Sequence, residues 1–119
     1  MNNPPQFRGG KNVALQVPPL QFESTIQSYR QLGIPILSDS PDNVIFAFGP
    51  MTLHITRNCR LSQAEVWFEL ISDDLLTASP AATVAGMSRC DDIEPLPEGF
   101  PGFWLTNPAG IVHLVTSLE

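Results

Sequence analysis

The chain contains few basic residues and few cysteines. It has 6 Lys and Arg against 12 Asp and Glu, so its formal net charge is −6. A surface of that sign repels phosphate backbones and anionic lipids, which argues against a nucleic acid or a membrane surface as partner. Cys59 and Cys90 are the only cysteines, too few for a disulfide scaffold or a four-cysteine zinc site. We therefore expect free thiols in a reducing compartment and a cytoplasmic location.

The sequence also lacks the long apolar run that a membrane span requires. Its first eleven residues are polar and rich in Pro and Gly, without the apolar core of a signal peptide. We expect residues 1–10 to form a flexible arm. With 43% hydrophobic and 15% charged residues, the chain has the composition of a folded protein, and its length predicts a single domain over residues 1–119.

The first half combines one helix with several strands. Residues 11–17 alternate between apolar and polar side chains, which is typical of a half-buried strand. In residues 20–32, Phe22, Ile26 and Tyr29 recur at helical spacing and predict a core-facing helix. Three further strands, separated by turn residues, are predicted at 34–38, 44–48 and 51–57.

The second half repeats this order of elements. It opens with an alternating strand, continues through a helix whose cap is predicted at Ser79 with Pro80 in its first position, and closes on a hairpin. The predicted segments are a strand at 63–71, a helix at 81–85, a strand stub at 87–90, a loop at 91–102, and strands at 103–106 and 111–116. Two βαβββ modules, at about 11–58 and 62–117, therefore predict an α+β fold.

Two stretches resemble one known group of proteins. The strand Asn12–Val17 followed by Tyr29 and Leu32-Gly33, and the closing Phe103–Leu114 with its turn Asn107-Pro108-Ala109-Gly110, are similar to the vicinal oxygen chelate superfamily. That superfamily includes glyoxalase I, extradiol dioxygenases, and bleomycin and fosfomycin resistance proteins. The resemblance implies two paired βαβββ modules that form a curled mixed sheet around a cleft, and a homodimer.

The resemblance also gives positions for a metal site. Metal-using members take ligands from the first and last strands of each module. Asn12 stands where the first module usually opens with a ligand His, and Glu65 stands at the corresponding place in the second. His54 and His113 lie near the two positions usually held by Glu, although without a gap Leu114 would take the place of His113.

One functional hypothesis follows from these ligands. His54, Glu65 and His113 together offer two imidazoles and a carboxylate, a set that suits Fe, Mn or Zn. Such a metal would polarise a substrate with two adjacent oxygens, as in a lyase or a dioxygenase. Glu69 would then act as the general base.

A second hypothesis needs no metal, and it is the leading one because Asn12 replaces the usual His. Asn12, Gln16, Trp67 and Glu69, with Glu65, fall on the predicted non-helix faces of the two opening strands. An indole flanked by carboxylates would bind a flat, cationic or amine-bearing small molecule, as bleomycin resistance proteins do, with Trp104 as a wall. A third hypothesis is an interaction module without an open cleft. The sequence does not decide whether a reaction is catalysed.

Overall fold

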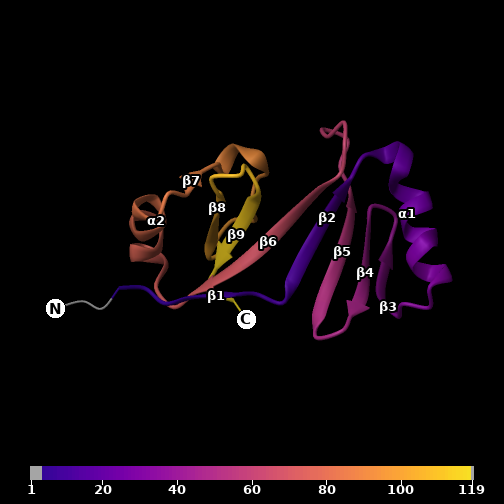
Figure 1. The fold of residues 1–119 in the computed structure, drawn as a ribbon, viewed down its shortest axis with the longest axis horizontal. Coiled ribbons are helices and arrows are strands. Elements are labelled where there is room, and N and C mark those ends of the chain that lie inside the picture. Colours follow the sequence, from indigo (N-terminus) through magenta and orange to yellow (C-terminus); the bar gives the residue numbers. More distant parts are fainter. Residues whose placement is uncertain (1–3, 119) are drawn as a thin grey trace. The chain divides into compact units, whose positions relative to one another are not determined.

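The structure is a computed structural model that describes residues 4–118. Within that range it contains nine strands, two α-helices and a short 3₁₀ helix (Figure 1). In chain order these are β1 (Phe7–Gly9), β2 (Asn12–Val17), α1 (Pro19–Gln31), β3 (Ile36–Ser40), β4 (Asn43–Phe48), β5 (Met51–Arg57), β6 (Glu65–Ser72), α2 (Leu75–Val84), β7 (Ser88–Arg89), η1 (Asp91–Ile93), β8 (Gly102–Thr106) and β9 (Val112–Thr116).

The strands pair in the order β3-β4-β5-β2-β6-β9-β8-β7, and β1 pairs with β6. The pairs β2–β5 and β6–β9 are parallel, and the other pairs are antiparallel. The sheet is therefore mixed, and the predicted α+β class is confirmed. Among the described residues, neither helix has the length and apolar content needed to cross a membrane.

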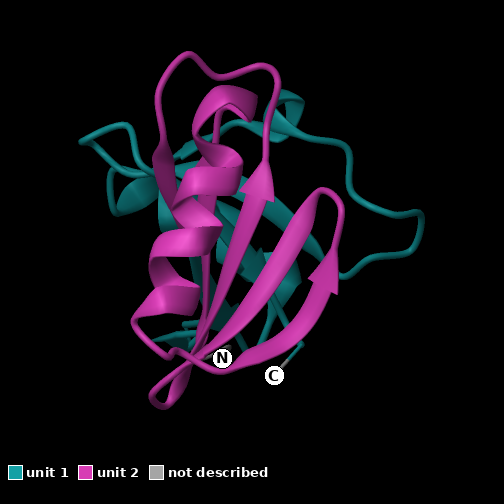
Figure 2. Cartoon of the chain, turned by 90° about the vertical axis from the view of Figure 1, so that its right-hand side faces the viewer, with its two compact units in different colours: residues 1–10, 68–119 teal, residues 11–67 magenta. Residues whose placement is uncertain are grey.

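The chain divides into two compact units (Figure 2). Unit 2 comprises residues 11–67, and unit 1 comprises residues 1–10 and 68–119. The division falls inside β6, between Trp67 and Phe68, rather than in the loop at 58–62 where the sequence pattern separates the two modules. One strand therefore supplies residues to both units.

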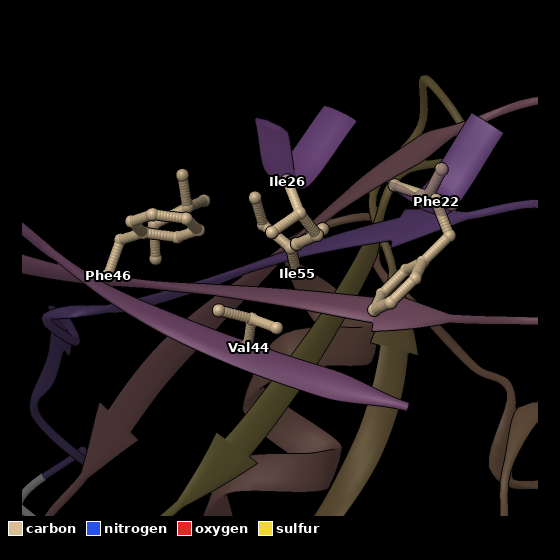
Figure 3. Close-up of a cluster of buried hydrophobic side chains, with 7 residues drawn as sticks. Phe22, Ile26, Val44, Phe46 and Ile55 are labelled. Atoms are coloured by element: carbon tan, nitrogen blue, oxygen red, sulfur yellow. The ribbon is translucent and has the colours of Figure 1, made fainter. Parts of the chain in front are cut away.

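Unit 2 is built on the predicted helical stripe. Phe22 and Ile26 of α1 point toward the apolar side chains of β4 and β5 (Figure 3), and Tyr29 packs with its ring centroid 5.6 Å from that of Phe46. Burial of these side chains stabilises the unit by roughly 1.5–3 kcal/mol for each one. The buried residues of this core are Val17, Phe22, Ile26, Val44, Phe46, Leu53 and Ile55.

The helix of unit 1 begins earlier than the sequence predicts. Ser79 and Pro80 were expected at its start, but α2 begins at Leu75 and has Asp74 as its N-cap. The Asp74 carboxylate accepts a hydrogen bond of 3.1 Å from the amide of Leu76, which satisfies one of the unpaired amides of the first turn. Pro80 lies inside the helix on its solvent side, so the expected position of the cap was wrong.

The expected N-terminal arm is in part a strand. Phe7–Gly9 form β1, which pairs antiparallel with Leu70–Ser72 of β6. The amide of Gln6 also donates a hydrogen bond of 2.7 Å to Asp73. These backbone contacts fix a segment whose Pro and Gly content predicted flexibility, so the expectation was wrong for residues 7–9. Residues 1–3 lie outside the described residues.

Candidate functional site

The face of the unit 2 sheet that faces away from α1 carries the polar side chains. Side chains alternate along a strand, and Val13 and Leu15 of β2 pack on the α1 core. Asn12 and Gln16 of β2 therefore project to the opposite face. The register of β2 with β5 and β6 brings five more residues to this face, namely Thr52, His54, Thr56, Glu65 and Trp67.

Asn12 and His54 form a direct pair on that face. Nε2 of His54 lies 3.2 Å from Oδ1 of Asn12. Because an amide oxygen only accepts hydrogen bonds, Nε2 carries the proton and donates. Both side chains are half-buried. The pair fixes the orientation of the imidazole on the same face as Gln16.

Glu65 and Gln16 stand opposite each other on adjacent strands. The indole N–H of Trp67 donates a hydrogen bond of 2.9 Å to Oε1 of Glu65. The Gln16 side chain, 4% exposed, accepts a hydrogen bond of 3.1 Å from the side-chain amide of Asn58. These bonds hold a carboxylate and an amide at fixed positions on one sheet face.

A small residue separates the two rings of this face. Ala14 pairs with His54 on one side and with Trp67 on the other, so the three residues form one row across β5, β2 and β6. Adjacent strands lie about 4.8 Å apart, which places the two ring-bearing positions roughly 10 Å from each other. Ala14 contributes only a methyl group between them.

Glu69 lies in unit 1 against the start of the chain. The Gly10 amide donates a hydrogen bond of 2.8 Å to the backbone carbonyl of Glu69. The Glu69 side chain passes over Gly10 so closely that a Cβ atom there would meet Oε1 at 2.0 Å. The candidate base therefore occupies space that only a glycine leaves.

Trp104 lies beneath the acidic segment of unit 1. Its ring is 6% exposed, and its indole N–H donates a hydrogen bond of 2.9 Å to the carbonyl of Glu94. Its backbone amide donates to the Asp91 carboxylate at 3.2 Å. The segment that the sequence predicts as a loop begins with η1, and it covers Trp104.

His113 shares its face of β9 with Val115, which packs on α2. Its ring centroid lies 5.5 Å from that of Phe68, and its Nδ1–H donates a hydrogen bond of 3.0 Å to the carbonyl of Ile111. Leu114 pairs with Glu69 and Trp104 in the adjacent strands. On the unit 1 face that points away from α2, the residue of β9 beside Glu69 is therefore Leu114.

These contacts bear on whether the chain can hold a metal ion. Within residues 4–118, no three His, Cys, Asp or Glu side chains are grouped as a metal site. In their hydrogen bonds to Asn12 and Trp67, His54 uses Nε2 and Glu65 uses Oε1, so a metal would have to be held through Nδ1 of His54 and Oε2 of Glu65. Of the predicted ligands, His54 and Glu65 lie in unit 2 and His113 lies in unit 1, and their use as one ligand set stays a prediction.

Sequence reasoning missed a groove of about 400 Å³ in unit 2. It lies between α1 and the strands β3 and β4, above the core side chains Phe22 and Ile26, and includes the ion pair of Arg30 with Asp39. The helical spacing places Arg30 one turn beyond Ile26, but no local pattern predicts that it meets Asp39. The groove contains none of the predicted site residues.

No protein-family model and no curated protein matches the sequence. Solved structures do match. The Mn(II)-bound glyoxalase from Novosphingobium aromaticivorans has a TM-score of 0.60 and 16% identity over 89% of this chain and 37% of that chain. A variant of homoprotocatechuate 2,3-dioxygenase from B. fuscum has a TM-score of 0.59 and 13% identity over 95% of this chain and 33% of that chain. A glyoxalase/bleomycin resistance protein/dioxygenase superfamily member from Vibrio splendidus has a TM-score of 0.57 and 11% identity. The match covers 92% of this chain and 97% of that chain.

At these identities the similarity concerns the fold. The chain has the fold of the vicinal oxygen chelate superfamily, which confirms at the level of the fold the resemblance seen in its sequence. It spans 37% and 33% of the glyoxalase and dioxygenase chains and nearly all of the Vibrio splendidus protein.

Proposed function

We propose that this chain binds a small molecule, with an amine or another cationic group, on the sheet face of unit 2 that points away from α1. The observation that carries the proposal is the set of oriented polar groups on that face. The pair of His54 with Asn12 stands beside Glu65 and Gln16, each held by a hydrogen bond. A few fixed polar groups beside apolar side chains are typical of a small-molecule site.

The charge of the chain favours a cationic ligand. The formal net charge is −6, and Glu65 supplies a half-buried carboxylate at the proposed site. We assign Glu65 to the ligand's cationic group, and His54, Asn12 and Gln16 to hydrogen bonds with its polar atoms. Trp67 keeps the Glu65 carboxylate in place and forms a wall. Glu69 and Trp104 remain predicted ligand-binding residues, and Glu69 remains the predicted base.

A metal-dependent lyase or dioxygenase is the alternative, because the glyoxalase match is a Mn(II)-bound protein and another match is a dioxygenase. It requires Fe, Mn or Zn on His54, Glu65 and His113. Asn12 stands where the resemblance has a ligand His, and an amide oxygen is a weaker ligand for these metals than an imidazole. We therefore place binding without a metal first.

The two histidines give a matched pair of variants for the test. His54→Ala removes the imidazole of the proposed site, and His113→Ala removes the imidazole beside Phe68 in unit 1. A panel of flat aromatic amines, with neutral isosteres of the same shape, is screened by thermal unfolding and by NMR of the imidazole resonances. At 100 times its Kd a ligand raises the free energy of unfolding by about 2.7 kcal/mol.

We expect the amines to shift the His54 resonance and raise the melting temperature, more than the isosteres do. This response should disappear in His54→Ala and persist in His113→Ala. Equal binding to both variants would refute the proposed site. The absence of any binder in the panel would favour the third hypothesis, an interaction module without an open cleft.

Metal content separates the leading proposal from its alternative. Protein purified without chelator is analysed for Fe, Mn and Zn. One metal ion per chain, lost in both His54→Ala and His113→Ala, would establish the alternative. Protein that binds amines equally well with and without a chelator would support binding without a metal.

The remaining properties of the proposal concern partners and location. We propose a homodimer, with no nucleic-acid or membrane partner, since an acidic chain is repelled by both surfaces. We also propose a cytoplasmic location, because Cys59 and Cys90 are both free thiols in the structure and such thiols persist in a reducing compartment.

A further inference from the structure

The outer side of α2 is exposed to solvent and mostly apolar. Thr83 is its one exposed polar residue, and the Thr83 hydroxyl donates a hydrogen bond of 3.1 Å to the carbonyl of Ser79 within the helix. Leu76, Pro80 and Val84 follow one another at intervals of four residues, so they lie on one stripe of the helix. Leu76 is 91% exposed and Val84 is 90% exposed, and Pro80 is also exposed. The opposite side of the helix packs into unit 1 through Ala78 and Ala82. We call Leu76, Pro80 and Val84 the α2 stripe.

No residue of α2 carries a charge. A surface helix ordinarily presents charged and polar side chains to water on the side opposite its core-facing residues. In α2 that side consists of the α2 stripe and Thr83, whereas 12 Asp and Glu residues are present in the rest of the sequence. Solvation therefore does not explain the composition of this helix, and a partner that covers the stripe would.

We infer that the α2 stripe is the surface through which two copies of this chain associate. Two copies with a net charge of −6 each repel one another over most of their surfaces, and a helix without charge is where that repulsion is weakest. This inference rests on the homodimer proposed above and adds the surface to it.

A twofold axis beside Pro80 makes the stripe complementary to itself. In such an isologous contact the two helices run antiparallel, so Leu76 of one copy lies against Val84 of the other, and the reverse. Antiparallel packing also places the positive end of each helix dipole beside the negative end of its partner.

The size of the stripe sets the expected strength. A helix of ten residues is about 15 Å long, so the contact buries less than the roughly 800 Å² per partner of a standard stable interface. We therefore expect a weak dimer whose population rises with protein concentration.

The chain offers a matched control for the test. Leu76 and Leu20 are both the second residue of a helix, and they are 91% and 92% exposed. Leu76→Asp and Leu20→Asp therefore introduce the same charge at the same helical position. A carboxylate in the first turn is favourable to the helix dipole, so we expect neither variant to unfold.

The average mass of each protein is measured by sedimentation equilibrium from about 10 µM to 1 mM, a range that spans weak association. We expect concentration-dependent dimers for the wild type and Leu20→Asp, and monomers throughout for Leu76→Asp. The double variant Leu76→Asp/Val84→Lys should recover dimers, because the twofold contact brings each introduced carboxylate to an introduced ammonium group.

The outcomes separate this inference from the proposal on which it rests. A wild type that stays monomeric over the whole range overturns both the homodimer and the surface. Dimers that persist in Leu76→Asp overturn the surface and leave the homodimer standing. Equal loss of dimers in both single variants would mean that added charge, rather than the α2 stripe, controls association, and would also overturn the inference.

Discussion

Replacing Gly10 by alanine should act through the side chain of Glu69. In the structure, a Cβ at position 10 would lie 2.0 Å from Oε1 and 2.6 Å from Cδ of Glu69. The carboxylate must therefore retreat by about 1.4 Å, from 2.0 to 3.4 Å, before ordinary contact is restored. Moving the side chain away from its preferred rotamer costs about 0.5–1.5 kcal/mol. Because the backbone of Gly10 does not have a positive φ, alanine adds no backbone strain.

The same substitution should be more favourable to stability when Glu69 is shortened. Glu69→Ala removes the three atoms nearest to a Cβ at position 10, and Gly10→Ala should then stabilise the fold by about 0.4–1 kcal/mol, since alanine restricts the unfolded chain. In the presence of Glu69 the rotamer cost and this gain oppose each other, so we expect a net effect between about 0.5 kcal/mol of stabilisation and about 1 kcal/mol of destabilisation.

A double-mutant cycle measures this coupling. The free energy of unfolding is obtained from urea titrations of the wild type, the two single variants and the double variant. We expect a coupling energy of about 1 kcal/mol, within the range for residues in contact. Gly10→Ala effects that agree in both backgrounds to within about 0.3 kcal/mol, the scatter of independent sites, would refute the contact between Gly10 and Glu69.

Three further predictions concern packing, capping and thiol chemistry. Phe46→Ala removes a fully buried ring of the unit 2 core and should lower the free energy of unfolding by about 3–5 kcal/mol in urea titrations. Asp74→Ala removes the N-cap of α2 and should cost about 1 kcal/mol, whereas Asp74→Asn should retain most of that stability. Burial, with the neighbouring Asp91 carboxylate, raises the pKa of the Cys90 thiol. At about pH 8.5 iodoacetamide should therefore alkylate exposed Cys59 before Cys90, as mass spectrometry of timed samples would show.

The sequence predicted the elements in which apolar side chains occupy one face only, either by alternating along a strand or by recurring at helical spacing. Asn12–Val17 places apolar residues on one side and polar residues on the other, so its strand and both faces could be inferred. In Val112–Thr116 apolar residues occur at both parities, so the pattern does not tell which face His113 occupies. Only the pairing with β6 and β8 determines that His113 lies beside Phe68.

Local signals failed where a tertiary contact decides the structure. Ser79-Pro80 is a helix-start pattern, yet Asp74 caps the helix five residues earlier. The composition of residues 1–10 predicts flexibility, yet β6 offers an edge to which Phe7–Gly9 pair. The site residues were selected by position in a resembling family. Some of their hydrogen-bond partners are distant in sequence: Asn58, the partner of Gln16, lies 42 residues from it, and no local pattern connects the two.

The division inside β6 determines how the protein can be dissected. A fragment that ends in the loop after β5 leaves out Glu65–Trp67 and exposes the backbone of β2 as a free edge. Such an edge can pair with another chain and favours aggregation. Residues 11–67 form one continuous stretch, whereas the other unit needs two separate stretches of chain, one from each end of the sequence. A circular permutant that joins residue 119 to residue 1 and opens the chain near Lys11 would give each unit an unbroken stretch of its own.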